Sequence, residues 1–212
     1  DEIKKEIGNT TLVAVSKTKS NEDILKAYDL GIRDFGENYV QELVLKMDTL
    51  PKDIKWHMIG HLQTNKVKYI APFISVIHSV DSLKLAKEID KQAQKNSRVI
   101  DCLLEVHIAQ EESKQGFSID EVKALMNGKV FSELPNINIV GLMGMASFTD
   151  DLESVRKEFR SLSTLFYNLK ESVAPQFKEL SMGMSNDYII AMEEGSTLVR
   201  IGTYLFGQRN YN

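Results

Sequence analysis

The chain has 212 residues, of which 42% are hydrophobic and 26% are charged, and its formal net charge is −4 at pH 7. This is the balance of an ordinary globular domain. The negative charge argues against a nucleic-acid partner, because nucleic-acid-binding proteins usually carry a basic face. No apolar run approaches the length of a transmembrane helix, so we expect no membrane span. The length predicts one domain over residues 1–212, which is sufficient for a complete barrel.

The only cysteine, Cys102, lies inside an apolar stretch. It has no partner for an internal disulfide, and we expect a small buried hydrophobe in a reducing, cytoplasmic setting. No secretory signal is visible. The sequence opens with Asp1 rather than Met, so we expect the natural start of the protein to lie upstream.

Eight short apolar runs, several of them rich in Val and Ile, predict buried strands. They are Leu12–Ser16, Arg33–Gly36, Trp56–Gly60, Ile74–Ser79, Ile100–Ile108, Asn138–Met145, Lys178–Met184 and Thr197–Gly202. Helical patterns lie between most of them, and this alternation predicts right-handed crossovers and a parallel sheet. The fold class is therefore α/β, and eight strands in a chain of this length predict a single (β/α)8 TIM barrel. A doubly wound open sheet is the alternative, although no Gly-x-Gly-x-x-Gly follows the first strand.

Capping residues mark the starts of several helices. Ser20 precedes the first helical face, and Ser118–Glu121 fits a capping box. Asp150 and Glu153 fit a third amino-terminal pattern ahead of a long apolar face. That face predicts the longest helix, with Leu152, Val155, Phe159, Leu162, Phe166 and Leu169 on one side.

Lys17 follows the first strand, at the end of a barrel where active sites lie. Lysine is rarely buried without a partner, and desolvation disfavours the ammonium form and so makes a better amine nucleophile. Such a lysine suits a Schiff base with a carbonyl compound, for which pyridoxal phosphate is the common cellular case. The alternative is an ammonium group that reaches solvent or pairs with a carboxylate.

Polar side chains also follow most of the other strands, and these strand ends meet at one rim of a barrel. They include Glu37, Asn38, Tyr39, His61, Gln63, Asn65, His78, Ser79, Asp81, Ser147, Ser185, Asn186, Asp187, Arg200, Gly202 and Thr203. Asn38 is placed either to bridge a cofactor and the lysine or to cap the following helix. No His, Cys or carboxylate spacing indicates a metal site. Ser16 lacks the glycines that surround a hydrolase nucleophile.

The loops after the seventh and eighth strands are rich in small residues, over Leu180–Asp187 and Glu194–Thr203. Glycines allow a backbone to approach an anion, hydroxyls donate hydrogen bonds, and barrels often bind phosphate in these two loops. The alternative is that Gly195 and Gly202 only permit turns. Arg200, inside the eighth strand, either pairs with a buried carboxylate or faces the nitrogen of a bound pyridine, which a cation keeps unprotonated.

Several stretches together carry a resemblance to a known family. They are Ala14–Lys19, Phe35–Glu42, Trp56–Gln63 with Asn65–Lys66, Gly141–Met145, Leu180–Ser185 and Gly195–Thr203. In this order they closely resemble the pyridoxal phosphate homeostasis proteins, which are single-domain relatives of the barrel domain of alanine racemase. The resemblance covers nearly the whole chain. It implies a (β/α)8 barrel that holds pyridoxal 5′-phosphate as an internal aldimine on Lys17.

The resemblance also assigns the remaining cofactor-binding residues. It places Arg200 at the pyridine nitrogen and Asn38 near the ring. It assigns the phosphate to Ser185, Gly202 and Thr203, with Ser181 as a neighbour. We expect no catalytic residue and no metal.

Two functions compete for this site, and a third is more distant. The first is a binding protein in vitamin B6 and amino-acid/keto-acid homeostasis, which holds the cofactor and delivers it to pyridoxal phosphate-dependent apoenzymes. The second is an amino-acid racemase or another pyridoxal enzyme, and a third is a barrel enzyme that uses Lys17 on phosphorylated metabolites. An arginine at the ring nitrogen weakens the electron sink, and the sequence lacks the second domain that supplies the other base in alanine racemase. We therefore expect a cytoplasmic monomer without substantial turnover.

Overall fold

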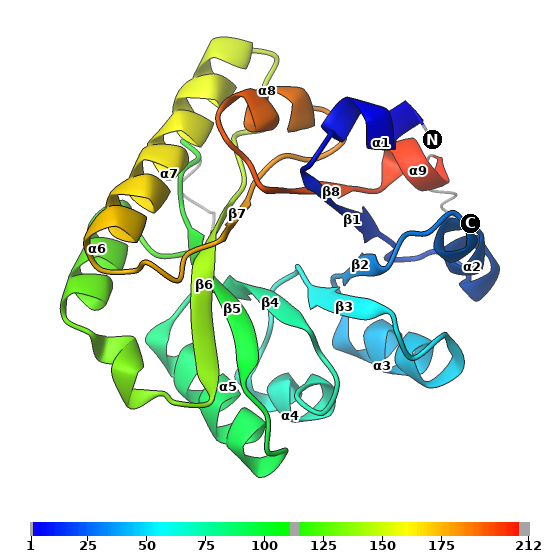
Figure 1. Cartoon of the computed structure of the whole chain (residues 1–212), viewed down its shortest axis with the longest axis horizontal. Helices are drawn as coiled ribbons and strands as arrows, with labels where there is room; N and C mark the ends of the chain where they lie inside the picture. The colour runs from blue at the N-terminus through cyan, green and yellow to red at the C-terminus, as the bar shows by residue number, and fades with distance from the viewer. Residues whose placement is uncertain (1, 111–114, 208–212) are drawn as a thin grey trace.

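The computed structural model describes residues 2–110 and 115–207. Within these residues eight parallel strands close into a barrel in sequence order (Figure 1). The strands are β1 (Thr11–Val15), β2 (Asp34–Glu37), β3 (Lys55–Met58), β4 (Val76–Val80), β5 (Ile100–Val106), β6 (Ile137–Gly144), β7 (Glu179–Ser181) and β8 (Leu198–Ile201). Each overlaps one of the predicted apolar runs. The prediction of a single (β/α)8 barrel is confirmed, and the open sheet is excluded.

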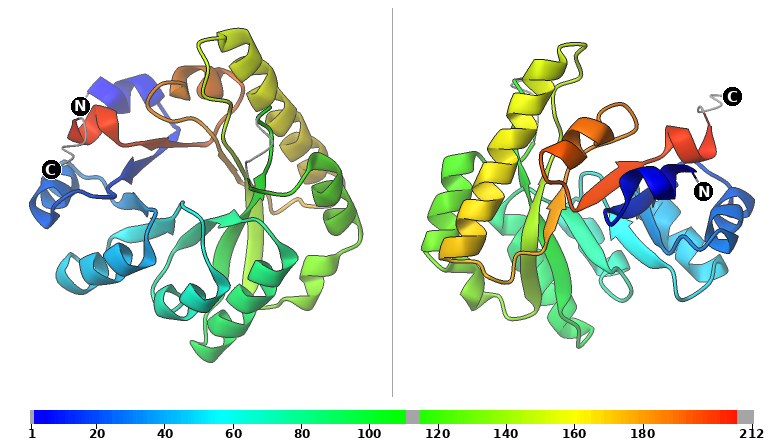
Figure 2. Two further views of the ribbon diagram at one scale, coloured as in Figure 1. Left: turned by 180° about the vertical axis from the view of Figure 1, so that it is seen from behind. Right: turned by 45° about the horizontal axis from the view of Figure 1, so that its top comes forward.

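Barrel closure depends on the pairing of β1 with β8, which runs in register from Thr11–Leu198 to Ala14–Ile201. The first and last helices cover this seam from outside, and they lie side by side in Figures 1 and 2. Ile3 of the first helix packs in one buried cluster with Val199 and Ile201 of β8. Because successive residues of a strand point to opposite faces, Arg200 between them points into the barrel.

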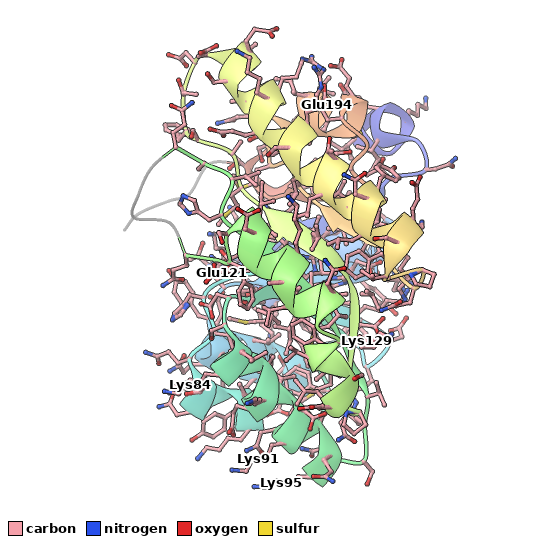
Figure 3. All side chains as sticks on the ribbon, turned by 90° about the vertical axis from the view of Figure 1, so that its left-hand side faces the viewer. Lys84, Lys91, Lys95, Glu121, Lys129 and Glu194 are labelled. Atoms are coloured by element: carbon pink, nitrogen blue, oxygen red, sulfur yellow. The ribbon has the colours of Figure 1, made fainter. Side chains whose placement is uncertain are left out.

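Helices surround the barrel on its outer side (Figure 2). They are α1 (Glu2–Ile7), α2 (Asn21–Asp29), α3 (Val40–Thr49), α4 (Val67–Ile70), α5 (Leu83–Lys95), α6 (Ile119–Asn127), α7 (Leu152–Ser172), α8 (Tyr188–Glu193) and α9 (Thr203–Phe206), with 3-10 turns η1 (Thr64–Lys66) and η2 (Val130–Glu133). Their polar faces meet solvent: Lys84, Lys91 and Lys95 project from α5 away from the barrel (Figure 3). No helix in the described ranges combines the length and the apolar character that a membrane span requires.

Local capping signals explain where these helices begin. The side chain of Ser20 caps α2, and the capping box at Ser118–Glu121 is formed at the start of α6. The prediction of Asp150 at the start of α7 was wrong by one residue. Asp151 caps this helix, because its carboxylate accepts hydrogen bonds from two backbone amides of the first turn. Leu152 is then the first helical residue and is 57% exposed, so it does not join the core.

The main apolar core lies between the barrel and the helices, where Phe35, Phe159, Phe166 and Phe177 are fully buried. The inside of the barrel is different. Polar side chains cross it, because a hydrogen bond joins His78 of β4 to the Ser181 side chain of β7, and these strands are not neighbours in the sheet. Barrel interiors are usually filled with branched apolar side chains, so polar residues there need an explanation.

Candidate functional site

A cavity of about 240 Å³ opens at the carboxyl ends of β1, β7 and β8. Its lining includes Lys17, Ser185, Arg200, Gly202 and Thr203, all of which the sequence predicted as site residues. Lys17 follows β1, Ser185 belongs to the loop after β7, and the other three come from β8 and its end. Closure of the barrel through β1 and β8 is therefore what brings the two ends of the chain together at one site.

The turn after β1 positions Lys17. Ser16 is fully buried, and its amide donates a hydrogen bond to the carbonyl oxygen of Gly36 at 3.0 Å. Thr18 then adopts a φ of 64°, and the amide of Lys19 returns to the carbonyl oxygen of Ser16 at 3.0 Å. Lys17 lies in the middle of this tight turn and is half-buried against the cavity.

The loop after β7 depends on Gly183, whose φ of +96° favours glycine. A Cβ atom at this position would lie 2.6 Å from the Cβ of Ala191 and 3.0 Å from the Cα of Tyr188. The Gly183 carbonyl oxygen accepts a hydrogen bond from the amide of Arg200 at 3.0 Å. This close packing against β8 and α8 brings Ser185 to the cavity.

Gly202 permits a close approach rather than a turn, because its φ is −121°. A Cβ atom there would lie 3.1 Å from both the Cβ and the carbonyl oxygen of Val15. The missing side chain therefore lets the end of β8 pack closely on the end of β1. Lys19 supports the same region, since its Nζ donates to the carbonyl oxygen of Phe206 at 3.0 Å.

Arg200 is buried, with only 4% of its surface exposed. Its guanidinium donates to the Ser181 hydroxyl, to the Ser181 carbonyl oxygen at 3.0 Å and to the Gly144 carbonyl oxygen at 3.1 Å. These acceptors are neutral, so its hydrogen bonds do not form the structural ion pair that the sequence left open. Burial lowers the pKa of Arg200 to about 10, although the charges of Asp187 and Glu105 oppose this change.

A chain of hydrogen bonds leads from Arg200 across the barrel. Ser181 contacts Nδ1 of His78 at 3.0 Å, His78 contacts His57 at 2.9 Å, and His57 contacts Asp34 at 3.0 Å. Burial holds the pKa of His78 well below its usual range, so this imidazole is neutral. Arginine can only donate, so the Ser181 hydroxyl accepts from Arg200 at the start of this chain. Ser181 does not line the cavity. Its hydroxyl accepts a hydrogen bond from the Arg200 guanidinium and so helps to fix the position of that group.

Asn38 lies in a neighbouring pocket that Tyr39, His61, Gln63 and Lys66 also line. It does not cap α3, because Tyr39 is the capping residue of that helix. Its Oδ1 is buried and has no hydrogen-bond partner among the described residues. The structure thus separates Asn38 from the cavity that Lys17 lines, and its approach to a cofactor ring stays a prediction.

Sequence analysis missed an ionic cluster that contacts the turn containing Lys17. Lys46 of α3 is 5% exposed and pairs with Glu37 at 2.8 Å and with Glu42. Burial raises the pKa of Glu37, and the charge of Lys46 opposes this rise. A signal was present in the sequence, because Lys46 continues the spacing of three residues between the buried Val40 and Leu43. A lysine on the apolar face of a helix needs a partner.

A second buried carboxyl group, Glu105 of β5, is 5% exposed. Burial raises its pKa to about 7, the charge of Asp81 adds to this rise, and Arg200 opposes it. Its position inside an apolar strand was the signal that sequence reasoning passed over. Among the residues that the structure describes, no three His, Cys, Asp or Glu side chains are grouped to hold a metal ion.

Comparison with known proteins gives a consistent result. The family described as alanine racemase, N-terminal domain, matches residues 1–210. The pyridoxal phosphate homeostasis protein of Aquifex aeolicus (strain VF5) is 44% identical over 201 residues, which cover 94% of this chain and 87% of that protein.

Solved structures agree with this match. PipY of Synechococcus elongatus PCC7942, without pyridoxal phosphate, has a TM-score of 0.88 and 35% identity. PipY with pyridoxal phosphate bound has a TM-score of 0.84 and 34% identity, and both comparisons cover 94% of this chain and 93% of PipY. The resemblance drawn from the sequence stretches is confirmed, and the chain belongs to the family of pyridoxal phosphate homeostasis proteins.

Proposed function

We propose that this protein binds pyridoxal 5′-phosphate in the cavity beside Lys17 and acts in vitamin B6 and amino-acid/keto-acid homeostasis. The observation that carries the proposal is the single cavity that Lys17 shares with Ser185, Arg200, Gly202 and Thr203. The PipY structure with bound pyridoxal phosphate and the name of the Aquifex relative support the same ligand.

The chemistry of the lining residues fits this cofactor. The volume of about 240 Å³ is slightly below the usual range of about 300–1,000 Å³ for drug-sized ligands, which suits a small phosphorylated ring. The phosphate would be bound by the hydroxyl groups of Ser185 and Thr203. It would also be bound by the backbone at Gly202, a residue without a side chain. Lys17 would supply the amine that condenses with the aldehyde of the cofactor, with loss of water. When bound, the cofactor supplies an electron sink for amino-acid chemistry.

Arg200 favours holding the cofactor over catalysis. In the proposed complex its guanidinium faces the pyridine nitrogen, and a permanent cation opposes protonation of that nitrogen. An unprotonated ring is a weaker electron sink, so amino-acid turnover is negligible in this proposal. The protein would act as a cytoplasmic monomer that limits the free aldehyde and passes the cofactor to apoenzymes.

Reduction with borohydride tests the proposal directly. Protein mixed with pyridoxal 5′-phosphate should show an absorption band near the visible edge that disappears on reduction, and peptide mass spectrometry should find the reduced adduct on Lys17. Lys17→Ala should stay folded and lose the adduct, with weak phosphate binding retained. Lys26→Ala is the control, because Lys26 is an exposed residue of α2.

Two results would contradict the proposal. Full adduct formation at another lysine in Lys17→Ala would remove Lys17 from its role. No reducible adduct in the unaltered protein would favour the enzyme for phosphorylated metabolites. Turnover is measured as solvent deuterium exchange at the α-carbon of alanine, and rapid exchange that Lys17→Ala abolishes would restore the racemase.

A further inference from the structure

We propose that the cluster of the buried residues Glu37 and Lys46 with the partly buried Glu42, called the Lys46 cluster below, is a positioning device for Lys17. The cluster ties down the backbone on both sides of Lys17 and so aims its amine into the cavity. The inference deepens the proposed function, because it rests on the covalent role of Lys17.

The first tie is on the amino-terminal side of Lys17. The Nζ of Lys46 donates to the carbonyl oxygen of Ser16 at 2.8 Å, and the same Nζ lies 2.8 Å from Oε1 of Glu37. The Ser16 hydroxyl donates to that Glu37 oxygen. Both the backbone and the side chain of Ser16 are therefore held, and Ser16 is fully buried.

The second tie is on the carboxyl-terminal side. The amide of Thr18 donates to Oε1 of Glu42 at 2.6 Å, and Lys46 pairs with the same carboxylate oxygen. Thr18 has a φ of 64°, a region that a β-branched residue rarely adopts. A charge-assisted hydrogen bond to its amide stabilises this turn. The two neighbours of Lys17 are thus joined through one lysine, Lys46.

Stability alone does not account for these charges. Lys46 and Glu37 are 5% and 0% exposed, and Oε2 of Glu37 has no hydrogen-bond partner among the described residues. Apolar residues of similar volume often give equal or greater stability than a buried ion pair, because the charges lose their hydration. The cluster donates to the carbonyl oxygen before Lys17 and accepts from the amide after it, and these two contacts with the Lys17 turn explain its place in the fold.

Position is important for the chemistry of Lys17. Its nitrogen must approach the aldehyde carbon so that the C–N bond forms and water leaves. Misplacement of a reacting group by about 1 Å costs on the order of 100-fold in rate. We therefore expect loss of a tie to slow adduct formation by about tenfold or more, without an equal loss of noncovalent binding.

The test measures the rate at which borohydride-reducible adduct forms on Lys17 with pyridoxal 5′-phosphate. Pyridoxamine 5′-phosphate, which has no aldehyde, reports noncovalent affinity. Glu42→Ala should slow the adduct about tenfold or more and leave pyridoxamine 5′-phosphate affinity unchanged. Glu42→Gln keeps an acceptor oxygen and should keep most of the rate. Lys26→Met is the matched control, because Lys26 is an exposed lysine of the neighbouring helix α2 and its loss should not change the rate.

A rescue variant separates position from general damage. Thr18→Gly in the Glu42→Ala background should recover part of the rate, because glycine adopts a positive φ freely. A folded Glu42→Ala protein that forms the adduct at the unaltered rate would overturn the inference. So would an equal loss with both probes, since that pattern indicates a structural role only.

Hydrogen exchange of the unaltered protein needs no variant. It therefore still tests the proposal if Glu42→Ala fails to fold. The Thr18 amide of the unaltered protein should be protected from hydrogen exchange. Exchange at the rate of a solvent-exposed amide would refute the proposed role of the Lys46 cluster. If the unaltered protein forms no adduct on Lys17, the proposed function fails by itself. The exchange measurement then still reports on the Lys46 cluster.

Discussion

Replacement of Arg200 by methionine tests whether this cation is present for the ligand or for the fold. Arg200→Met removes a buried charge and its hydrogen bonds to Ser181 and Gly144. Methionine has an unbranched, flexible side chain of comparable length and fits irregular interior space. We expect the variant to fold and to be more stable than the unaltered protein.

The magnitude follows from opposing contributions. Typical net values of about 0.5–1.5 kcal/mol per hydrogen bond give a loss of roughly 2–4 kcal/mol for the contacts of Arg200. The fall of its pKa to about 10 corresponds to roughly 3 kcal/mol of unfavourable burial, which methionine relieves. Burial of a methionine side chain adds about 1.5–3 kcal/mol in favour of the variant. The free energy of unfolding should therefore rise by roughly 0.5–4 kcal/mol in the variant.

Urea denaturation of the cofactor-free proteins measures this difference. A loss of more than about 3 kcal/mol would refute the reasoning and show that Arg200 is mainly structural, because its hydrogen bonds would then outweigh both the relief of the buried charge and the burial of methionine. A second measurement uses the proteins loaded with pyridoxal 5′-phosphate. If the spectra of Arg200→Met and the unaltered protein titrate identically with pH, Arg200 does not contact the ring.

Two further predictions concern stability. Gly183→Ala should lower the free energy of unfolding by about 2–5 kcal/mol, from the disfavoured φ and the close contact with Ala191. Gly8→Ala has a positive φ but open space around it, so in urea denaturation it should lose only about 1–2 kcal/mol, and equal losses would contradict the packing argument. Burial raises the pKa of Glu105 from 4.5 to about 7, so the folded state keeps a proton that the unfolded chain releases. Stability should fall by about 3 kcal/mol between pH 4.5 and 7 relative to Glu105→Gln, and parallel pH curves would refute this.

Local patterns in the sequence were sufficient for the elements. Strand positions follow from short apolar runs, and the caps at Ser20 and Ser118 follow from side chains that accept hydrogen bonds from the amide three residues away. The error at Asp150 has the same origin, since two adjacent aspartates offer the same local signal and only the helix geometry selects Asp151. The sequence also determined most of the cavity, because strand ends in a parallel barrel share one rim.

Only the tertiary structure shows which buried side chains contact one another beneath that rim. The sequence placed Lys17 and Arg200 at one rim, and the structure adds the register of β1 against β8, which no local pattern specifies. The contacts of Arg200 with neutral oxygens, the chain through His78 and the burial of Lys46 each depend on which distant polar atoms meet in a dry interior. A residue's type states which hydrogen bonds it requires, whereas the packed barrel determines which partners supply them.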